Sequence, residues 1–217
     1  MSSPAAAPVL AADGLVFSWP QRHVFTNASF AFGAGLSWVR GVNGSGKSTL
    51  LAILAGAVEP QVGRLAVRGI DAAADPVGYR REVFYCGPGA IAFDHLRPPE
   101  YFAFIQGLYP RFDAAALARQ VEAFGLAPHF DMPLAALSTG TQRKVGVAAA
   151  LVVGSAAVLL DEPAAALDRA AQRHLHDELA SRADDAGRSW IFTSHESPGR
   201  AGERASCIDL PPPAPFP

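Results

Sequence analysis

Residues 41–50 read GVNGSGKSTL, and this stretch decides the fold class of the chain. Its matches to the pattern GxxxxGK(S/T) are Gly41, Gly46, Lys47 and Ser48. The glycines let backbone N–H groups turn toward phosphate oxygens, and the following helix presents its positive N-terminus to the same oxygens. A β-like run, LSWVR, comes directly before the loop, and a helix-like run, KSTLLAILAG, begins inside it. This context predicts a phosphate-binding loop between a strand and a helix.

The loop assigns a role to most of its side chains. We expect Lys47 to reach the β- and γ-phosphates of a nucleotide, and the Ser48 hydroxyl to bind Mg²⁺. Lys47 is therefore a candidate catalytic residue as well as a binding residue. The other loop residues expected to contact the nucleotide are Asn43, Gly44, Ser45, Gly46 and Thr49.

The second decisive stretch is AAVLLDEP at 156–163, in which a pair of acids follows an apolar run. Unbroken apolar runs are typical of strands that are buried on both faces of a parallel sheet. Asp161 therefore ends a buried strand, where an enzyme with a phosphate-binding loop needs an acid beside its metal ion. Glu162 comes next and is the candidate for polarising the attacking water, a role that typically contributes about 10²–10⁴ in rate.

The composition of the whole chain excludes several classes of protein. It has 217 residues, of which half are hydrophobic, and a formal net charge of −2. A full core is expected, and there is no general signal for binding nucleic acid. The N-terminus lacks the basic start of a signal peptide, and the longest apolar run, 145–160, is short for a membrane span. We therefore expect a cytoplasmic protein with reduced cysteines.

The pattern of the sequence changes along the chain. Short β-like runs fill residues 9–40, and further ones are GRLAVRG at 63–69 and REVFYC at 81–86. Helical spacing takes over near residue 90, before the buried strand, an amphipathic helix and a last strand, SWIFTSH. The order predicts an α/β protein with a mainly parallel sheet covered by helices.

This order also predicts how the chain is divided. We expect a disordered segment at 1–8, one domain over 9–210 with a helical part at about 90–145, and a Pro-rich tail at 211–217 that forms no regular structure.

The stretch LSTGTQRK at 137–144 separates this chain from the kinases, GTPases, recombinases and helicases that share the first two motifs. It places a hydroxyl and backbone amides at a helix N-terminus, where they can face phosphate. It resembles the LSGGQ signature loop of the ATP-binding cassette (ABC) ATPases. Leu137, Ser138 and Gly140 match that loop, whereas Thr139 and Thr141 depart from it.

Three more features resemble those of the ABC family and follow its order along the chain. PAAALD at 163–168 is similar to the D-loop and contains Asp168. His195 in FTSHE resembles the switch histidine that contacts the γ-phosphate. Trp19 in VFSWPQRHVF lies where the family places an aromatic ring that stacks on adenine, whereas Phe17 is expected in the core. Stacking of an aromatic ring on a base is worth about 1–3 kcal/mol in nucleic-acid complexes.

The resemblance covers about residues 9–210 and implies both a fold and an assembly. The fold is that of a P-loop NTPase: a RecA-like core with a parallel sheet, an antiparallel β subdomain and an inserted helical subdomain. The assembly is a head-to-tail dimer with two ATP sites. Each ATP would lie between the phosphate loop of one copy and the signature loop of the other, which comprises Ser138, Thr139, Gly140 and Thr141.

The same resemblance implies an activity and its ligands. ATP and Mg²⁺ would be bound, with Ser48 and Asp161 holding the metal ion. ATP hydrolysis would depend on Lys47, Glu162 and His195. The second ATPase subunit would be the same chain or a related one. Hydrolysis would power transport through separate membrane-spanning subunits, which would hold this chain at the cytoplasmic face of the membrane.

One family feature is missing from the sequence. ABC ATPases normally carry a glutamine after the strand that corresponds to REVFYC, where it helps to hold Mg²⁺ and links the site to the membrane partner. No glutamine occurs between Gln61 and Gln106, and the equivalent position falls at Pro88 or Gly89. Neither has a side chain that ligates a metal ion, so we expect an active but slow ATPase.

Three functional hypotheses remain open. The first is the ATPase subunit of a transporter, and FTNASF, LSTGTQRKV and TSHE resemble the small subgroup that serves haem export in cytochrome c maturation. The second is a soluble ABC ATPase that acts on ribosomes or DNA, although such proteins usually carry two cassettes or long inserts. The third is a degenerate regulatory subunit that binds ATP but barely hydrolyses it, which the missing glutamine suggests.

Overall fold

The computed structural model describes residues 7–89, 92–195 and 197–212. Most of the N-terminal segment predicted to be disordered and most of the Pro-rich tail lie outside these ranges. The boundaries proposed for the domain and for its helical part therefore remain predictions.

A small antiparallel sheet occupies the first third of the chain, as the β-like runs predict. Its strands, in spatial order, are β2 (Arg22–Phe32), β1 (Leu10–Trp19), β4 (Val62–Val67) and β5 (Ile70–Asp71). The long strand β1 pairs with β2 on one side and with β4 on the other. It ends at Trp19, so the turn into β2 carries this side chain to one end of the sheet.

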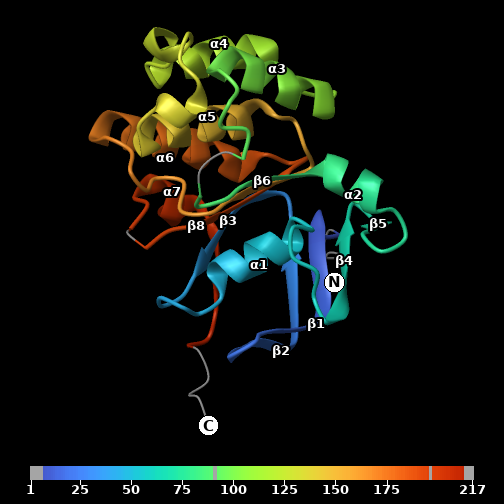
Figure 1. Ribbon diagram of the computed structural model, residues 1–217. Helices are drawn as coiled ribbons and strands as arrows, with labels where there is room; N and C mark the ends of the chain where they lie inside the picture. The colour runs from blue at the N-terminus through green and yellow to red at the C-terminus, as the bar shows by residue number, and fades with distance from the viewer. Residues whose placement is uncertain (1–6, 90–91, 196, 213–217) are drawn as a thin grey trace.

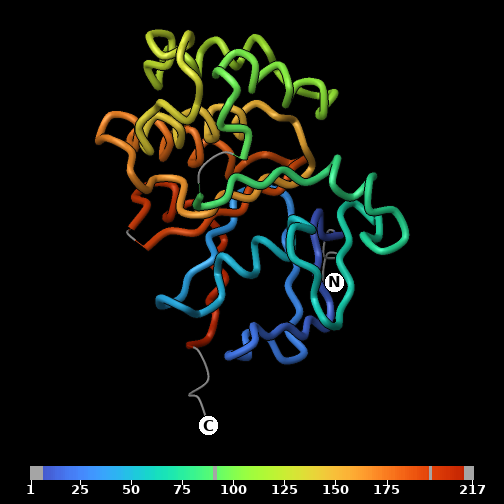
Figure 2. The backbone as a smooth tube through the Cα atoms, in the orientation of Figure 1, coloured from blue at the N-terminus to red at the C-terminus, as the bar shows by residue number. Residues whose placement is uncertain are grey.

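A parallel sheet forms the core. Its strands, in spatial order, are β6 (Val83–Cys86), β7 (Ala157–Leu160), β8 (Ser189–Thr193), β3 (Gly35–Arg40) and β9 (Ser206–Asp209). The tube in Figure 2 shows the last of these strands beside β3, which lies far from it in the sequence. Because the strands are parallel, their carboxyl ends share one edge of the sheet.

Helices cover both faces of this sheet (Figure 1). They are α1 (Lys47–Leu54), α2 (Pro76–Glu82), α3 (Pro98–Leu108), α4 (Ala114–Ala123), α5 (Thr139–Val152), α6 (Arg169–Ser181) and α7 (Arg200–Arg204). Figure 1 shows α3 and α4 in an outer layer at the top, α5 and α6 between them and the sheet, and α1 below the sheet. The α/β class and the three predicted parts are therefore confirmed.

Strand β7 shows how the sheet divides two hydrophobic cores. Its side chains alternate: Val158 and Leu160 pack in the core under α5 and α6, and Ala157 and Leu159 pack in the core around α1. All four are fully buried. A strand that is apolar on both faces explains the unbroken apolar run before Asp161.

The interpretation of residues 81–86 as one strand is wrong at its start. Residues 81 and 82 end helix α2, and the strand β6 begins at Val83. Asp75 caps this helix by accepting a hydrogen bond of 2.8 Å from the Gly78 amide, and Pro76 occupies the first turn. An N-cap and a proline at the first turn are helix-start signals that the sequence analysis missed.

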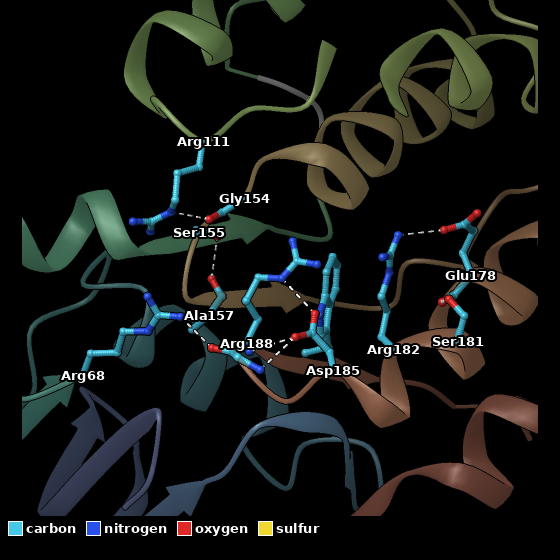
Figure 3. A network of polar contacts seen from close by, with 12 residues as sticks. Arg68, Arg111, Gly154, Ser155, Ala157, Glu178, Ser181, Arg182, Asp185 and Arg188 are labelled. Carbon is cyan, nitrogen blue, oxygen red and sulfur yellow. Dashed lines mark hydrogen bonds and ion pairs between the residues drawn. The ribbon is translucent and has the colours of Figure 1, made fainter. Parts of the chain in front are cut away.

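The amino-terminal edge of the parallel sheet is held by a network of polar contacts (Figure 3). Asp185 accepts hydrogen bonds from the Trp190 indole at 3.0 Å and from Arg188 at 2.8 Å. Arg111 donates to the Gly154 carbonyl at 2.8 Å, just before β7.

No helix in the described part of the chain is both long enough and apolar enough to cross a membrane.

Candidate active site

The loop between β3 and α1 lines a cavity of about 260 Å³. The predicted residues on its wall are Trp19, Asn43, Gly44, Gly46, Lys47, Ser48, Thr49 and His195. Ser45 does not line this cavity, because it is buried behind the loop and faces a different hollow, and Asp161 and Glu162 do not line it either. Gly46 has a φ of +100°, a conformation that L side chains rarely adopt, and a Cβ there would lie 2.7 Å from Val24. The loop therefore needs glycine at this position.

Lys47 is the charged group at the centre of the loop. Its side chain is only 6% exposed, and Nζ donates to the carbonyl oxygens of Gly41 at 2.8 Å and of Val42 at 3.3 Å. A buried ammonium needs acceptors, and the curled loop supplies two of them. Anionic phosphate oxygens are stronger acceptors than carbonyls, so the cradle suits a phosphate.

Trp19 stands at the open side of the cavity. Its ring is 47% exposed, packs edge-on against Phe17 at 5.0 Å, and donates from Nε1 to Thr49 Oγ1 at 3.3 Å. Phe17 is only 5% exposed, so it belongs to the core as expected. An exposed indole that is fixed at its edge and at its nitrogen is a suitable platform for a flat ring.

Arg22 also lines the cavity, and the sequence analysis did not single it out. Its guanidinium donates to the Gly44 carbonyl of the phosphate-binding loop. Nothing in the sequence marks this residue, because it begins strand β2, twenty-two positions before the glycine that it contacts. The pairing of β1 with β2 brings it there.

The two predicted acids lie at the carboxyl edge of the parallel sheet. Asp161 is fully buried directly after β7, and its Oδ1 accepts a hydrogen bond of 2.7 Å from Thr193 Oγ1. The same hydroxyl accepts the Glu162 amide at 2.8 Å. Thr193 is fully buried at the end of β8, the neighbouring strand, so one hydroxyl fixes both acids. The sequence analysis missed Thr193.

Glu162 and His195 meet at the same edge. Glu162 has a φ of +49°, an uncommon conformation for any residue except glycine. Its Oε2 accepts the His195 backbone amide at 3.1 Å, and its Oε1 lies 3.3 Å from the His195 imidazole Nε2. This second contact is not a hydrogen bond, and Oε1 has no hydrogen-bond partner among the described residues. The acid is thus held through one oxygen and keeps acceptor capacity on the other.

The available donors fit Mg²⁺ rather than a transition metal. The described residues contain no cluster of three or more His, Cys, Asp or Glu side chains that could hold an ion by themselves. Mg²⁺ typically takes one or two carboxylates and completes its shell with phosphates and water. Asp161 supplies a carboxylate, and Ser48, on the cavity wall, supplies a hydroxyl.

The predicted signature loop lies away from the cavity of its own chain, since none of its residues lines it. Ser138 caps α5, and its Oγ accepts the Thr141 amide at 3.1 Å and contacts Thr141 Oγ1 at 2.9 Å. Thr139 is exposed. A Cβ on Gly140 would lie 2.5 Å from the Ala166 carbonyl oxygen, so glycine lets the D-loop pack closely here.

Asp168 joins the D-loop to the signature helix. Its Oδ1 caps α6 through the Ala170 and Ala171 amides at 3.0 and 2.9 Å. Its Oδ2 accepts a hydrogen bond of 2.6 Å from Lys144 on α5. The hydrogen bond from Lys144, aided by the one from the Ala171 amide, lowers the pKa of Asp168 to about 2. The carboxylate therefore stays ionised at neutral pH.

The loop after β6 has an unexpected partner. The position of the missing family glutamine falls at Pro88 or Gly89, and the carbonyls of Gly87 and Pro88 accept hydrogen bonds from Arg143 on α5. Cys86, at the end of the strand, is a free thiol, and burial raises its pKa. Tyr85 precedes it, with its hydroxyl 3.5 Å from Asp161 Oδ2.

Comparisons with known proteins agree on the kind of protein that this chain resembles. The family model described as "ABC transporter" matches residues 25–165. The chain is 33% identical to the "Cytochrome c biogenesis ATP-binding export protein CcmA" of Pseudomonas savastanoi pv. phaseolicola, over 94% of this chain and 96% of that protein. It is 36% identical to the protein of the same name from Cupriavidus pinatubonensis, over 90% and 87%.

Solved structures show the same fold. "Structure of ATP binding subunit of ABC transporter" superposes with a TM-score of 0.80 at 23% identity, covering 93% of this chain and 85% of that one. "Structure of a bacterial Atm1-family ABC exporter with ATP bound" gives a TM-score of 0.75 at 21% identity, covering 99% of this chain and 39% of that one.

Proposed function

The chain belongs to the ABC transporter family, as one of its ATP-binding and ATP-hydrolysing subunits, and on that premise we propose which residues perform each step. Lys47 and the backbone amides of the loop at 41–50 bind the β- and γ-phosphates, and Trp19 stacks on the adenine. The buried position of Lys47 supports this role, because its two carbonyl acceptors can be exchanged for phosphate oxygens.

The metal ion is held by Asp161 together with the Ser48 hydroxyl. When bound, Mg²⁺ would neutralise part of the phosphate charge. Asp161 is fixed for this task by the hydrogen bond from Thr193 to Oδ1, and among the described residues its Oδ2 has one hydrogen-bonding neighbour, the Tyr85 hydroxyl at 3.5 Å. One carboxylate oxygen is thus used to orient the residue and the other is left for the metal ion.

Glu162 is the general base. Its carboxylate accepts a proton from the attacking water as the water oxygen bonds to the γ-phosphorus and the bond to ADP breaks. The His195 amide holds Oε2 at 3.1 Å, and the imidazole lies beside Oε1. His195 also lines the cavity, so we propose that its side chain contacts the γ-phosphate.

Two copies of the chain, or this chain and a related one, form the working unit. The signature residues are exposed or half-buried and lie outside the cavity of their own chain, although they present a helix N-terminus suited to phosphate. We propose that Ser138, Thr139, Gly140 and Thr141 complete the ATP site of the second subunit. Binding then closes the pair and hydrolysis opens it.

A membrane-spanning partner receives this motion. A groove of about 530 Å³ separates the core from α3, and the exposed apolar side chains Phe93, Phe104 and Leu108 line it. Apolar side chains grouped around a groove, rather than scattered singly, indicate an interaction site. The loop residues Gly87 and Gly89 also line the groove, which connects it to the catalytic edge. We propose that a helix of the membrane partner docks there, at the cytoplasmic face.

The names of the relatives suggest what is exported. Both describe an ATP-binding export protein of cytochrome c biogenesis. We propose that this chain powers an export step of the same process, with haem as the cargo to test first.

The observation that carries the mechanism is the pair of contacts that hold Glu162 while leaving acceptor capacity on Oε1. We expect Glu162→Gln to lower MgATP turnover by about 10² or more while ATP binding is retained. Turnover is measured as phosphate release by the purified chain, and binding as quenching of tryptophan fluorescence. Glu203→Gln, at an exposed position on α7, is the matched control and should turn over at the wild-type rate. Equal phosphate release from both variants would rule out Glu162 as the base.

The partner is tested with the same variant. Tagged Glu162→Gln protein should hold the ATP-closed pair together, so it is captured from detergent-solubilised membranes with ATP present and the bound proteins are identified by mass spectrometry. We expect a membrane protein with several spans in near-stoichiometric amount. Recovery of soluble partners alone would contradict the transport function.

A further inference from the structure

Arg143 is a buried cation at a position to which the mechanism above gives no role. It lies in the second turn of α5, and the residue is only 8% exposed. Arginine is rarely buried unless its charge is paired. Among the described residues no carboxylate forms an ion pair with it, and its guanidinium donates instead to the carbonyls of Gly87 and Pro88. Burying a cation without an anion costs free energy of desolvation. This indicates that the contact between Arg143 and the loop has a role in the structure or in the function.

The geometry of the contact suits a guanidinium. One terminal nitrogen of Arg143 donates to the Gly87 carbonyl and the other to the Pro88 carbonyl, so the planar fork spans two consecutive residues of the loop. The fork contacts the two neighbouring carbonyls with a separate nitrogen for each. The loop is therefore fixed in both position and orientation relative to α5.

The loop leads directly to the catalytic edge. The residue before it, Cys86, accepts the Asp161 amide at 2.9 Å through its backbone carbonyl. The residue that follows Cys86 is Gly87, whose carbonyl Arg143 holds. The guanidinium and the proposed metal ligand thus contact consecutive residues at the end of β6.

The same loop forms part of the groove wall. Gly87 and Gly89 line the groove together with residues of α3. Any helix that docks in the groove contacts the segment that Arg143 holds. Arg143 itself lies five residues after Ser138, on the helix that presents the signature residues. The Arg143 side chain therefore connects the groove wall with the signature helix.

We propose that Arg143 is a positioning residue that joins the loop at 87–88 to the signature helix, so that the groove wall, the loop and the signature residues move as one body. This inference rests on the proposed function. It also gives a reason why a loop without glutamine can still be coupled: the link runs from a side chain of α5 to the backbone of the loop, instead of from a loop side chain to the metal ion.

The test compares Arg143→Met, Arg143→Lys and Arg119→Met in the purified full-length chain. Methionine keeps the bulk of the stem but donates no hydrogen bond, and lysine offers a single nitrogen in place of the fork. Arg119 is an exposed arginine on α4 and is the control. For each variant we would measure the melting temperature, ATP affinity, kcat, and amide hydrogen exchange of a peptide spanning residues 81–89.

We expect Arg143→Met to accelerate exchange in this peptide and to lower kcat about tenfold, a typical size for a coupling residue. ATP affinity should stay within about twofold of wild type, because the residue does not line the nucleotide cavity. Arg143→Lys should recover part of kcat, and Arg119→Met should match wild type. This split between kcat and affinity, with partial rescue, would support positioning.

Two results would overturn the inference. One is unchanged loop exchange and unchanged kcat in a folded Arg143→Met protein. The other is an equal loss of ATP affinity, kcat and melting temperature in both the Met and the Lys variants, which would make Arg143 a general structural residue. Failure of the proposed function looks different: wild-type protein would release no more phosphate than Glu162→Gln, while loop exchange would still respond to Arg143→Met.

Discussion

The two edges of the parallel sheet use polar side chains in opposite ways. At the amino edge, Asp185 is saturated by Trp190 and Arg188, and the groups face one another inside the chain (Figure 3). At the carboxyl edge, Asp161 is held through one oxygen by Thr193, and Glu162 keeps an oxygen without a hydrogen bond among the described residues. The acid at the amino edge has both oxygens occupied within the chain, whereas the acids at the carboxyl edge are oriented and keep capacity for a ligand.

Both edges are built from the same strands, so the difference does not come from the fold alone. Strand β8 begins with Ser189 and ends with Thr193, and both hydroxyls are fully buried. Ser189 Oγ has no hydrogen-bond partner among the described residues, whereas Thr193 Oγ1 joins two acids. The carboxyl edge is therefore distinguished by its hydrogen-bond partners, which are the two candidate catalytic acids. Substitutions at matched positions of the two edges can test this contrast.

The largest effect is expected for Thr193→Val. Valine has the same shape but cannot donate to Asp161 or accept the Glu162 amide, so both acids lose their common anchor. A misplacement of about 1 Å at a reacting centre can lower the rate about 10²-fold, and we expect kcat to fall by this order. The unsatisfied buried amide should also lower the free energy of unfolding by about 1–3 kcal/mol. Phosphate release and urea unfolding measure the two effects.

Thr193→Ser separates the hydroxyl from the packing of the methyl group. It retains both hydrogen bonds, so kcat should stay near wild type even though the small cavity costs some stability. If serine and valine lowered kcat equally, the hydroxyl would have no part in placing the acids.

A second contrast uses a glycine at each edge. Gly140→Ala would place a Cβ 2.5 Å from the Ala166 carbonyl and force the signature helix away from the D-loop. Gly154→Ala, at the amino edge, would place a Cβ 2.2 Å from the Arg111 carbonyl at a φ of +74°. We expect Gly140→Ala to lower kcat about tenfold with a small loss of stability. For Gly154→Ala, the backbone strain by itself should lower the free energy of unfolding by about 1–3 kcal/mol.

The readouts are kcat per folded molecule and the melting temperature. The contrast holds if each variant changes mainly one of the two quantities. A Gly154→Ala protein that remains folded but loses turnover would show that the amino edge also contributes to catalysis.

The sequence predicted the parts of this site that lie within one continuous stretch. The phosphate-binding loop and the acids after β7 have their spacing fixed by a single strand and turn, so the pattern alone places them. Arg22, Thr193 and Arg143 were missed, because each acts on a residue far away in the sequence. Strand pairing and helix packing bring these partners together, and no local pattern records that.

The fold shows the same division. Long apolar or alternating runs predicted β1, β3 and β7, because burial on one or both faces sets their period. The short helix α2 was missed and its last two residues were assigned to a strand, since its start depends on the single cap at Asp75 rather than on a repeated pattern. The missing glutamine was visible in the sequence, but the contact of Arg143 with the same loop was not, since that contact comes from α5.

The third prediction concerns pH. Burial raises the pKa of Asp185, but hydrogen bonds from Trp190, Gly187 and Arg188 outweigh burial and leave it below its usual 3.8. A carboxyl whose pKa is lowered by folding adds stability that is complete above the unfolded pKa and is lost as the pH falls through the folded one. We therefore expect wild type to exceed Asp185→Asn in stability at pH 6, and the difference to shrink below about pH 3.8.

Urea unfolding at several pH values measures that difference, and kcat at neutral pH should change little. A difference that stays constant from pH 6 to below pH 3.8 would show that the carboxylate charge is not what stabilises the amino edge.

The smallest effect is expected at the other end of β8, for Ser189→Ala. The Ser189 hydroxyl is buried without a hydrogen-bond partner among the described residues, so its removal relieves a desolvation cost instead of breaking a contact. We expect a change in the free energy of unfolding within about 0.5 kcal/mol, or a slight gain, and no change in kcat. A loss comparable to that of Thr193→Val would mean that the two ends of the strand are equivalent. The two hydroxyls are equally buried and lie on one strand. A near-zero effect of Ser189→Ala beside a large effect of Thr193→Val would therefore show that the two edges differ in hydrogen-bond partners and not in burial.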